Sequence, residues 1–284
     1  MKTLREQYMS DVLSRTADGS NKADSYIRAL GYLGPILAAK SRAFDAFSDI
    51  YAIHDVAIIR RLYKYIVEQQ RLGIAGIFDN EFKPSYWRSR FYSAALNDYI
   101  NFLLQRQYEN KLWAIYDAPH MQPKAMAEQF NAVELDAAEI DQEDADVVEL
   151  SGTDVLQMVK TRRNQRFFRS MILRDYSTTC CITGLTVPEV LRASHIIPWA
   201  EDEKNRMNPT NGLCLSATYD AAFDRHLISF DETYRLVLAP ALKEQYTDEA
   251  FKRYFLAFEG AQMALPQRFK PSQIFLEKHR EEMA

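Results

Sequence analysis

Three short stretches decide the fold of this chain: SHIIPW at residues 194–199, NGLCLS at 211–216 and DAAFDR at 220–225. The first two have the composition of short strands, and the third has helical composition. Asp220 and Asp224 are four residues apart, so on a helix both carboxylates point to the same side. A histidine beside two such carboxylates can hold a divalent metal ion and activate a water molecule. This set of residues suits the hydrolysis of a phosphodiester bond.

Short strands are expected on both sides of these stretches, because apolar residues cluster in runs of strand length between turn residues. Residues 217–225 and the tail 271–282 have helical composition instead. Ahead of the strands, residues 151–180 carry six basic residues among apolar ones, which is typical of one or two helices with a basic side. The expected strands are residues 180–183, 192–197, 212–215, 227–230 and 234–238.

The front of the chain has a different pattern. Between residues 24 and 118, apolar residues recur at spacings of three and four, which predicts several amphipathic helices. Gly34-Pro35 and the segment 73–76 are expected to interrupt this helical run, because glycine and proline favour turns. Residues 1–118 are therefore expected to form a small helical domain.

An acidic segment separates the two patterns. Residues 119–150 hold nine acidic residues against one basic residue, Lys124, and such a run favours a solvated linker. Phe130 and the other apolar residues between the acids are also compatible with the alternative of a partly docked helix. Together the three regions predict an α+β protein, with the short strands in a second domain over residues 151–284.

Bulk composition excludes several classes of protein. The chain has 284 residues, 47% of them hydrophobic, and only three cysteines, which argues against a disulfide framework and for a reducing compartment. No window resembles a signal peptide or a membrane span, so we expect a cytoplasmic protein. The net charge of -4 counts against a wide phosphate-binding face but not against a local one. Cys180 and Cys181 are adjacent and Cys214 is alone, so packed thiols are expected rather than a structural zinc site.

The order and spacing of these motifs resemble one known family. SHIIPW, NGLCLS and the segment AAFDRHLISFDE at 221–232 are similar to the HNH endonucleases, whose active site is a ββα-metal finger. CCITGL at 180–185 and RFKPSQIFLEKHRE at 268–281 resemble the same branch of that family. The resemblance covers about residues 155–282. It implies a nuclease domain behind the helical one, hydrolysis of DNA to a 5′-phosphate and a 3′-hydroxyl, and a role in restriction or defence.

The resemblance also implies a role for each polar residue of the motif. His195 matches the general base, and an unperturbed imidazole pKa of about 6.5 lets it take a proton from water at neutral pH. Asn211 matches the middle asparagine, whose amide can brace the loop before the helix and keep His195 aimed. Asp220 and Asp224 match the two metal-ligand positions of the helix. Two aspartates favour Mg²⁺ or Mn²⁺ over zinc.

The sequence departs from the family pattern at the supposed metal site. Many relatives have an aspartate or a histidine directly before the base, where this chain has Ser194. The last histidine of the motif is replaced by Asp224, and His226 stands where relatives often have glycine. His226 is either a replacement ligand or part of a turn.

Four arginines are expected to contact DNA. Arg192 and Arg225 lie nearest the motif and are the candidates for gripping the scissile strand, whereas Arg163 and Arg166 belong to the basic segment. The alternative for that segment is a solvated helix face. The helical front domain is expected either to contact DNA or another protein or to serve as a scaffold. One metal finger per chain favours a homodimer for cutting both strands.

Two other functions compete with a nuclease. Ser194 and the replaced histidine are compatible with a non-catalytic nucleic-acid-binding module that kept the fold but lost productive metal. Alternatively, the front domain senses an effector and controls a latent nuclease. The motif itself is compatible with RNA as well as DNA as the substrate.

Overall fold

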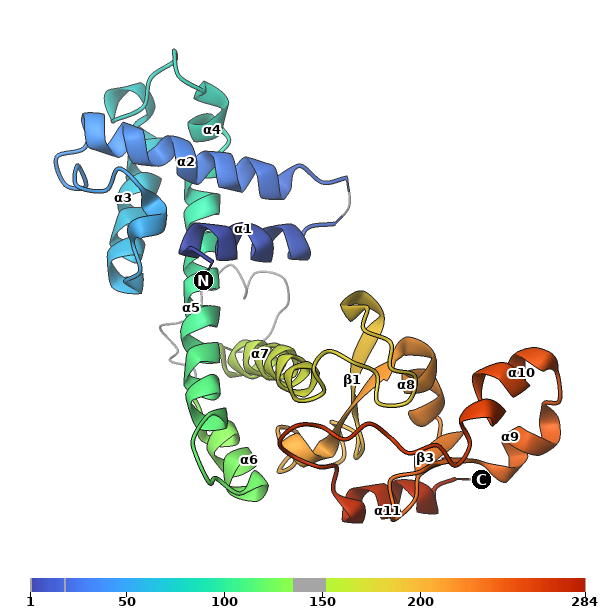
Figure 1. Cartoon of the computed structure of the whole chain (residues 1–284). Helices are drawn as coiled ribbons and strands as arrows, with labels where there is room; N and C mark the ends of the chain where they lie inside the picture. The colour runs from blue at the N-terminus through green and yellow to red at the C-terminus, as the bar shows by residue number, and fades with distance from the viewer. Residues whose placement is uncertain (1, 18, 135–151, 284) are drawn as a thin grey trace. The chain divides into compact units, whose positions relative to one another are not determined.

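A computed structural model describes residues 2–17, 19–134 and 152–283. These residues form helices and two small two-stranded sheets (Figure 1), so the α+β class expected from the sequence is confirmed. The chain divides into two compact units, Met1–Tyr108 and Glu109–Ala284. Every helix in the described ranges is too short or too polar to span a lipid bilayer.

The first unit is built from helices around an aromatic core. At the start of α1 (Leu4–Arg15), Thr3 and Glu6 form a capping box that satisfies two free backbone amides. In the core, the buried rings of Tyr8 and Tyr99 meet edge to face with centroids 5.2 Å apart. The elements are α1 (Leu4–Arg15), α2 (Lys22–Lys40), η1 (Ile50–Ala52), α3 (Val56–Leu72), η2 (Gly73–Ala75), α4 (Pro84–Arg88) and the larger part of α5 (Phe91–Tyr116).

Helix α2 corrects one prediction, because it continues through Gly34-Pro35, where an interruption was expected. A Cβ atom at residue 34 would lie 2.1 Å from the backbone oxygen of Ser48, so glycine lets the following loop pack directly on the helix. We infer that this packing offsets the helical hydrogen bond that proline cannot donate. The other predicted interruption is confirmed: α3 ends at Leu72, and Gly73 has a φ of 59°.

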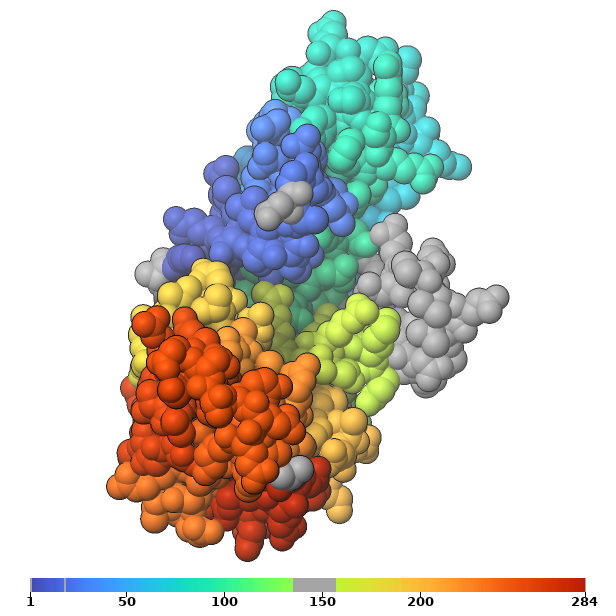
Figure 2. All heavy atoms as spheres, turned by 90° about the vertical axis from the view of Figure 1, so that its right-hand side faces the viewer, coloured from blue at the N-terminus to red at the C-terminus, as the bar shows by residue number. Residues whose placement is uncertain are grey.

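The second unit combines helices with the two antiparallel hairpins, β1–β2 and β3–β4. In Figure 2 the orange-red atoms of α9 and α10 lie on the face turned toward the viewer. The elements after α5 are α6 (Pro123–Ala132), α7 (Gly152–Asp175), η5 (Pro188–Val190), β1 (Leu191–His195), η6 (Pro209–Asn211), β2 (Gly212–Ser216), α8 (Ala217–Phe223), β3 (Ile228–Phe230), β4 (Leu236–Leu238), α9 (Pro240–Gln245), α10 (Glu249–Tyr254), η7 (Leu256–Phe258) and α11 (Gln273–Glu281).

The boundary between the units falls inside α5, earlier than residue 118, where the sequence analysis placed it. The last turns of α5 pack on α7, since the rings of Trp113 and Phe167 lie 4.8 Å apart. Helix α6 lies within the segment expected as an acidic linker, and its Phe130 is buried 5.3 Å from Phe167. The remainder of that segment, residues 135–150, lies outside the described residues.

Four of the five expected strands are present, with ends shifted by a few residues. The strand expected over residues 180–183 is wrong, because the segment forms turns that end at Gly184, which has a φ of 72°. Cys180, Cys181 and Cys214 are free and buried, as expected. Burial raises the pKa of the Cys181 thiol well above its usual range and that of Cys214 to about 12.

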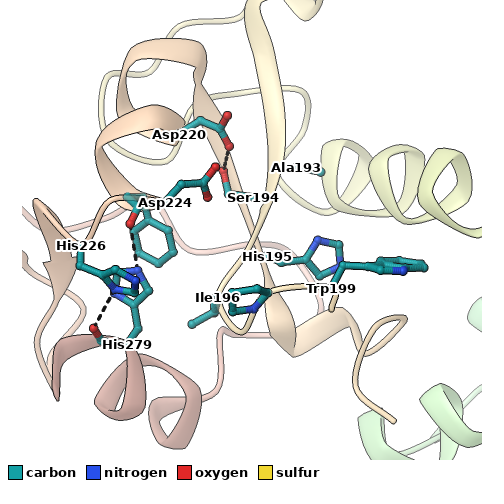
Figure 3. Close-up of a pocket in the computed structure, with 11 residues that line it drawn as sticks. Ala193, Ser194, His195, Ile196, Trp199, Asp220, Asp224, His226 and His279 are labelled. Atoms are coloured by element: carbon teal, nitrogen blue, oxygen red, sulfur yellow. Dashed lines mark hydrogen bonds between the residues drawn. The ribbon is translucent and has the colours of Figure 1, made fainter. Parts of the chain in front are cut away.

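The β1–β2 hairpin lies between two helices that position the site. Helices α7 and α8 both contact β1 and β2, and they lie on opposite sides of β1 in Figures 1 and 3. The order β1, β2, α8 is the ββα arrangement expected from the sequence. Phe168 and Ile172 of α7 are buried against this hairpin, and a helix-covered hairpin gives the site a rigid base.

Candidate active site

Strand β1 sends its last two side chains in different directions, because successive side chains on a strand alternate between faces. In Figure 3, Ser194 points toward Asp220 and Asp224, whereas the imidazole of His195 points away from them toward Trp199. All five residues line one open cavity of about 420 Å³. The structure therefore brings the expected base and the expected carboxylates to one cavity, but on different sides of the strand.

The two carboxylates come from α8 and the residue that follows it. Asp220 is half-buried and accepts a hydrogen bond from the hydroxyl of the buried Ser194. Asp224 is more exposed, and partial desolvation together with the charge of Asp220 raises the pKa of its carboxyl. Arg225 and His226 oppose this shift but do not cancel it. Two carboxylates that repel each other in this way form a site that attracts a cation.

The donor set fits a hard divalent ion. Asp220 and Asp224 supply oxygen atoms, and Mg²⁺ is commonly held by one or two carboxylates together with water and substrate phosphates. In the part of the chain that the structure describes, no group of three or more histidine, cysteine or acidic side chains is arranged to hold a metal. His195 is directed away from the carboxylates, which separates its ring from these two candidate ligands.

The environment of His195 sets both its tautomer and its protonation state. Its Nε2 lies 2.9 Å from the backbone oxygen of Arg206. A carbonyl oxygen only accepts, so Nε2 carries the hydrogen and Nδ1 keeps its lone pair. Burial lowers the pKa of the imidazole, and the Arg206 carbonyl opposes this only in part. The half-buried ring also stacks on Phe168 of α7, with centroids 3.9 Å apart. His195 is therefore a neutral, oriented proton acceptor at neutral pH.

Asn211 lies behind the cavity and not in it. It is fully buried, and its Oδ1 accepts a hydrogen bond of 2.8 Å from the backbone N–H of Ile197. Its Nδ2 donates to the backbone oxygens of Ile197 and Asn205, at 3.2 and 3.1 Å. These bonds tie η6 to both ends of the loop that carries Trp199. We therefore infer that Asn211 is a positioning residue and not a group that touches the substrate.

The two arginines nearest the motif are exposed. Nη1 of Arg192 donates to the backbone oxygens of Glu189 and Leu191, at 3.1 and 3.0 Å. Nη1 of Arg225 donates to the backbone oxygen of Ala221 at 2.8 Å. Neither side chain lines the cavity. Contact between these two arginines and DNA stays a prediction.

The basic segment on α7 is only partly accessible, and contact between its arginines and DNA stays a prediction. Arg163 is only 7% exposed, so it cannot contribute to an outer phosphate-binding surface. Arg166 is exposed, and its Nε lies 3.7 Å from Oε1 of Glu109. Nη2 of Arg174 is paired with Asp117 of the segment after α5 at 2.9 Å. These contacts hold α7 to its neighbours in the second unit.

One histidine that the sequence analysis did not single out supports the carboxylate helix. His279 of α11 is 3% exposed and stacks on Phe223 of α8, with ring centroids 3.8 Å apart. Its Nε2 donates to the backbone oxygen of Phe223 at 3.1 Å, so its Nδ1 accepts from the hydroxyl of Ser229 at 3.0 Å. Burial and the neighbouring His226 lower the pKa of His279 to about 4. Nothing in the sequence distinguishes this residue from other charged or polar residues of a terminal helix.

The end of α11 also positions His226. Its φ of 54° puts it in the left-handed region, directly after the Asp224-Arg225 pair. Its Nδ1 lies 3.4 Å from the backbone oxygen of His279, and its Nε2 lies 3.5 Å from Glu282. His226 lines the cavity, but these contacts turn both ring nitrogens toward the end of α11. Of the two roles considered from the sequence, this geometry favours a turn residue.

The approach of β2 to α7 permits a test of the packing under His195. A Cβ atom on Gly212 would lie 2.4 Å from Cδ1 of Ile172 and 2.8 Å from Cζ of Phe168. Because both neighbours are buried, we expect Gly212→Ala to lower the free energy of unfolding by about 1–3 kcal/mol. Displacement of Phe168 should also disturb the ring that stacks on it. Chemical denaturation of the wild-type protein and the variant measures this difference.

Gly31→Ala is the matched control for that substitution. No heavy atom lies within 4 Å of the position that its Cβ would take inside α2. We expect the control to be neutral or stabilising by about 0.5–1 kcal/mol, because alanine favours the helix. A Gly212→Ala protein as stable as the wild type would show that the contact between the hairpin and α7 is looser than described.

Comparison with known proteins identifies the region around this cavity. Residues 180–231 match a family model described as HNH endonuclease. The match spans β1, β2, α8 and β3, and it includes His195, Asn211, Asp220 and Asp224. No curated protein matches the chain.

Proposed function

We propose, on the premise that residues 180–231 belong to the HNH endonuclease family, that this protein is a metal-dependent endonuclease acting on DNA. The observation that carries the proposal is the shared cavity. A neutral imidazole with a free Nδ1 lines it on one side, and two mutually repelling carboxylates line it on the other. Such a pair of opposed functions suits the hydrolysis of a phosphodiester placed between them.

The protein groups have separate tasks in the proposed reaction. Asp220 and Asp224 would hold Mg²⁺ or Mn²⁺, whose chemistry is to neutralise charge on the phosphate and on the leaving oxygen. Nδ1 of His195 takes a proton from a water molecule, and the water oxygen forms a bond to phosphorus. The bond from phosphorus to the 3′ oxygen then breaks, and the 3′ oxygen takes a proton from solvent. The products are a 5′-phosphate and a 3′-hydroxyl.

Three hydrogen-bonded supports keep these groups in place. The Arg206 carbonyl fixes the tautomer of His195, and Asn211 fixes the loop that leads to Arg206. The hydroxyl of Ser194 donates to Asp220. Ser194 therefore supports a carboxylate at the position where many relatives have a metal ligand. We place the protein in restriction or defence on the resemblance of the motif alone.

A plasmid-nicking assay tests the proposal directly. With Mg²⁺ or Mn²⁺, the wild-type protein should convert supercoiled DNA to open circles, and chelation should stop the reaction. The double variant Asp220→Asn/Asp224→Asn should cut at least about 100-fold more slowly. The same variant should be no less stable than the wild type, because it removes the charge of the partly desolvated Asp224 and its repulsion by Asp220. Unfolding curves for both proteins provide this control.

Other results would identify the competing functions. Binding without cutting of DNA or RNA by the full chain, with either ion, would overturn the proposal in favour of a non-catalytic binding module. Cutting by residues 109–284 but not by the full chain would indicate a latent nuclease. The shorter protein should begin at residue 109 and not at 151, since the end of α5 packs on α7.

A further inference from the structure

A second polar cavity lies beside the first, and the motif residues do not account for it. It has a volume of about 310 Å³ and is bounded by α6, α7 and the loop between β1 and η6. Its lining includes Asn131 of α6, Lys160 of α7, and Trp199, Lys204 and Arg206 of the loop. Trp199 lines both cavities, so the two are neighbours across one aromatic ring.

The charge of this second cavity is positive. Lys160, Lys204 and Arg206 line it, and Glu203 is its only acidic lining residue among the described ones. Glu203 lies 3.2 Å from Arg206, but its side chain is 79% exposed, so solvent screens this pair. The ammonium group of Lys204 is exposed and has no hydrogen-bond or ion-pair partner in the described part of the chain. The cavity therefore has cationic donors available for an anion.

The walls of the cavity are held together by specific hydrogen bonds. Nζ of Lys160 donates to the backbone oxygen of Asn131 at 2.9 Å. Nδ2 of Asn131 donates in turn to the backbone oxygen of Lys204 at 3.1 Å. Nε of Arg206 donates to the backbone oxygen of Trp199 at 2.6 Å, and its guanidinium lies over the indole ring. These contacts fix α6, α7 and the loop before any ligand arrives, which lowers the entropic cost of binding.

Arg206 links this cavity to the proposed chemistry. Its side chain faces the second cavity, whereas its backbone oxygen holds the imidazole of His195 in the first. From this arrangement we propose that the second cavity is a phosphate subsite, which binds a backbone phosphate next to the scissile one on the same strand. The inference rests on the proposed function. A DNA strand that crosses Trp199 contacts the carboxylates and the imidazole in the first cavity, and Lys204 and Arg206 in the second.

This subsite lies outside the matched motif in part, because α6 and α7 precede residue 180. The subsite also gives a role to α6, which lies near the start of the acidic region of the sequence. Its Asn131 orients the loop backbone beside Lys204. The phosphate-binding residues proposed for the second unit then include the loop and one position of α7, in addition to the exposed arginines expected from the sequence.

Salt-dependent binding of a short DNA duplex without divalent ions tests the subsite, because nothing is cut under these conditions. Each phosphate contact contributes about 0.9 to the slope of log affinity against log salt concentration. We expect Lys204→Ala to bind more weakly than the wild type at low salt and to lose about one unit of this slope. Lys270→Ala is the matched control, since Lys270 is an exposed lysine of the same unit that lines neither cavity.

The outcomes separate this inference from the proposed function. Equal slopes for Lys204→Ala and Lys270→Ala, or a wild-type slope of zero, would overturn the subsite. Cutting of the same duplex with Mg²⁺ is measured on the same three proteins. If the wild type cuts DNA and the slopes of Lys204→Ala and Lys270→Ala are equal, the nuclease proposal stands and the subsite is wrong. If Lys204→Ala loses slope and the wild type cuts nothing, Lys204 contacts a phosphate of bound DNA, but the nuclease and the position next to a scissile phosphate are both overturned.

Discussion

Replacing His195 by alanine should slow DNA cleavage by about 10²–10⁴-fold, the usual contribution of a general base. The expectation follows from the free Nδ1 atom, which the hydrogen bond from Nε2 to the Arg206 carbonyl leaves available. Because His195 is not among the proposed metal ligands, DNA binding should change little. Single-turnover cleavage at saturating protein measures the chemical step, and a binding assay without divalent ions measures the affinity.

Two further readouts separate a base from a merely structural residue. Added imidazole should restore part of the activity of His195→Ala, because the variant leaves the space of the ring empty beside Phe168 and Trp199. It should not restore activity to Asp220→Asn/Asp224→Asn. The wild-type rate should fall on the acid side only below the ordinary histidine range, since burial lowers the pKa of His195. His120→Asn, which removes an exposed imidazole of the same unit, should behave like the wild type.

An undiminished single-turnover rate in His195→Ala would contradict the role of this residue. Loss of activity without any rescue by imidazole, together with a lower free energy of unfolding, would indicate that the ring only supports the packing of β1 on α7.

The second large effect concerns stability and rests on His279. The pKa of this imidazole falls from its ordinary value of 6.5 to about 4 in the folded protein, so the unfolded chain takes up a proton more readily. The contribution of neutral His279 to the free energy of unfolding is therefore fully present above pH 6.5. As the pH drops from 6.5 toward 4, the folded protein should lose about 3 kcal/mol from this one group.

The comparison of the wild type with His279→Gln isolates this contribution, because carboxylates titrate in the same range in both proteins. Between pH 4 and 6.5, the free energy of unfolding of His279→Gln should depend less steeply on pH, by up to about 1.4 kcal/mol per pH unit. At pH 7 the variant should be less stable by about 1–3 kcal/mol, since Ser229 and the Phe223 carbonyl lose a buried partner. His120→Asn should keep the wild-type slope. Equal slopes in the wild type and His279→Gln would contradict the buried neutral state.

Much of the β1–β2 hairpin and of α8 was predictable because their signals are local. The spacing of Asp220 and Asp224 places both on one side of a helix turn, and both line the cavity. The strands around His195 and Asn211 follow from short apolar runs between turn residues. The hydrogen bond of Ser194 to Asp220 was not predictable, because it depends on how α8 packs against β1.

The features that the sequence did not predict depend on contacts between distant segments. The arginines of α7 have the composition of a nucleic-acid-binding face, yet Arg163 is buried and Arg174 pairs with Asp117, far away in sequence. Similarly, the partners of His279 lie on α8 and β3. Helix α2 passes through Pro35 because packing at Gly34 outweighs local preference. Local sequence patterns predict the helices and strands of this chain, whereas tertiary contacts determine which polar side chains are accessible to a ligand.

The burial of all three thiols has a practical consequence for following the protein in action. Cys180, Cys181 and Cys214 are enclosed, so thiol-directed reagents have no ready native target on the folded chain. A single cysteine introduced on the exposed surface near the second cavity would then carry a fluorophore or spin label at one defined place. The arrival of a nucleic acid at the loop beside Trp199 becomes observable without first removing any natural residue.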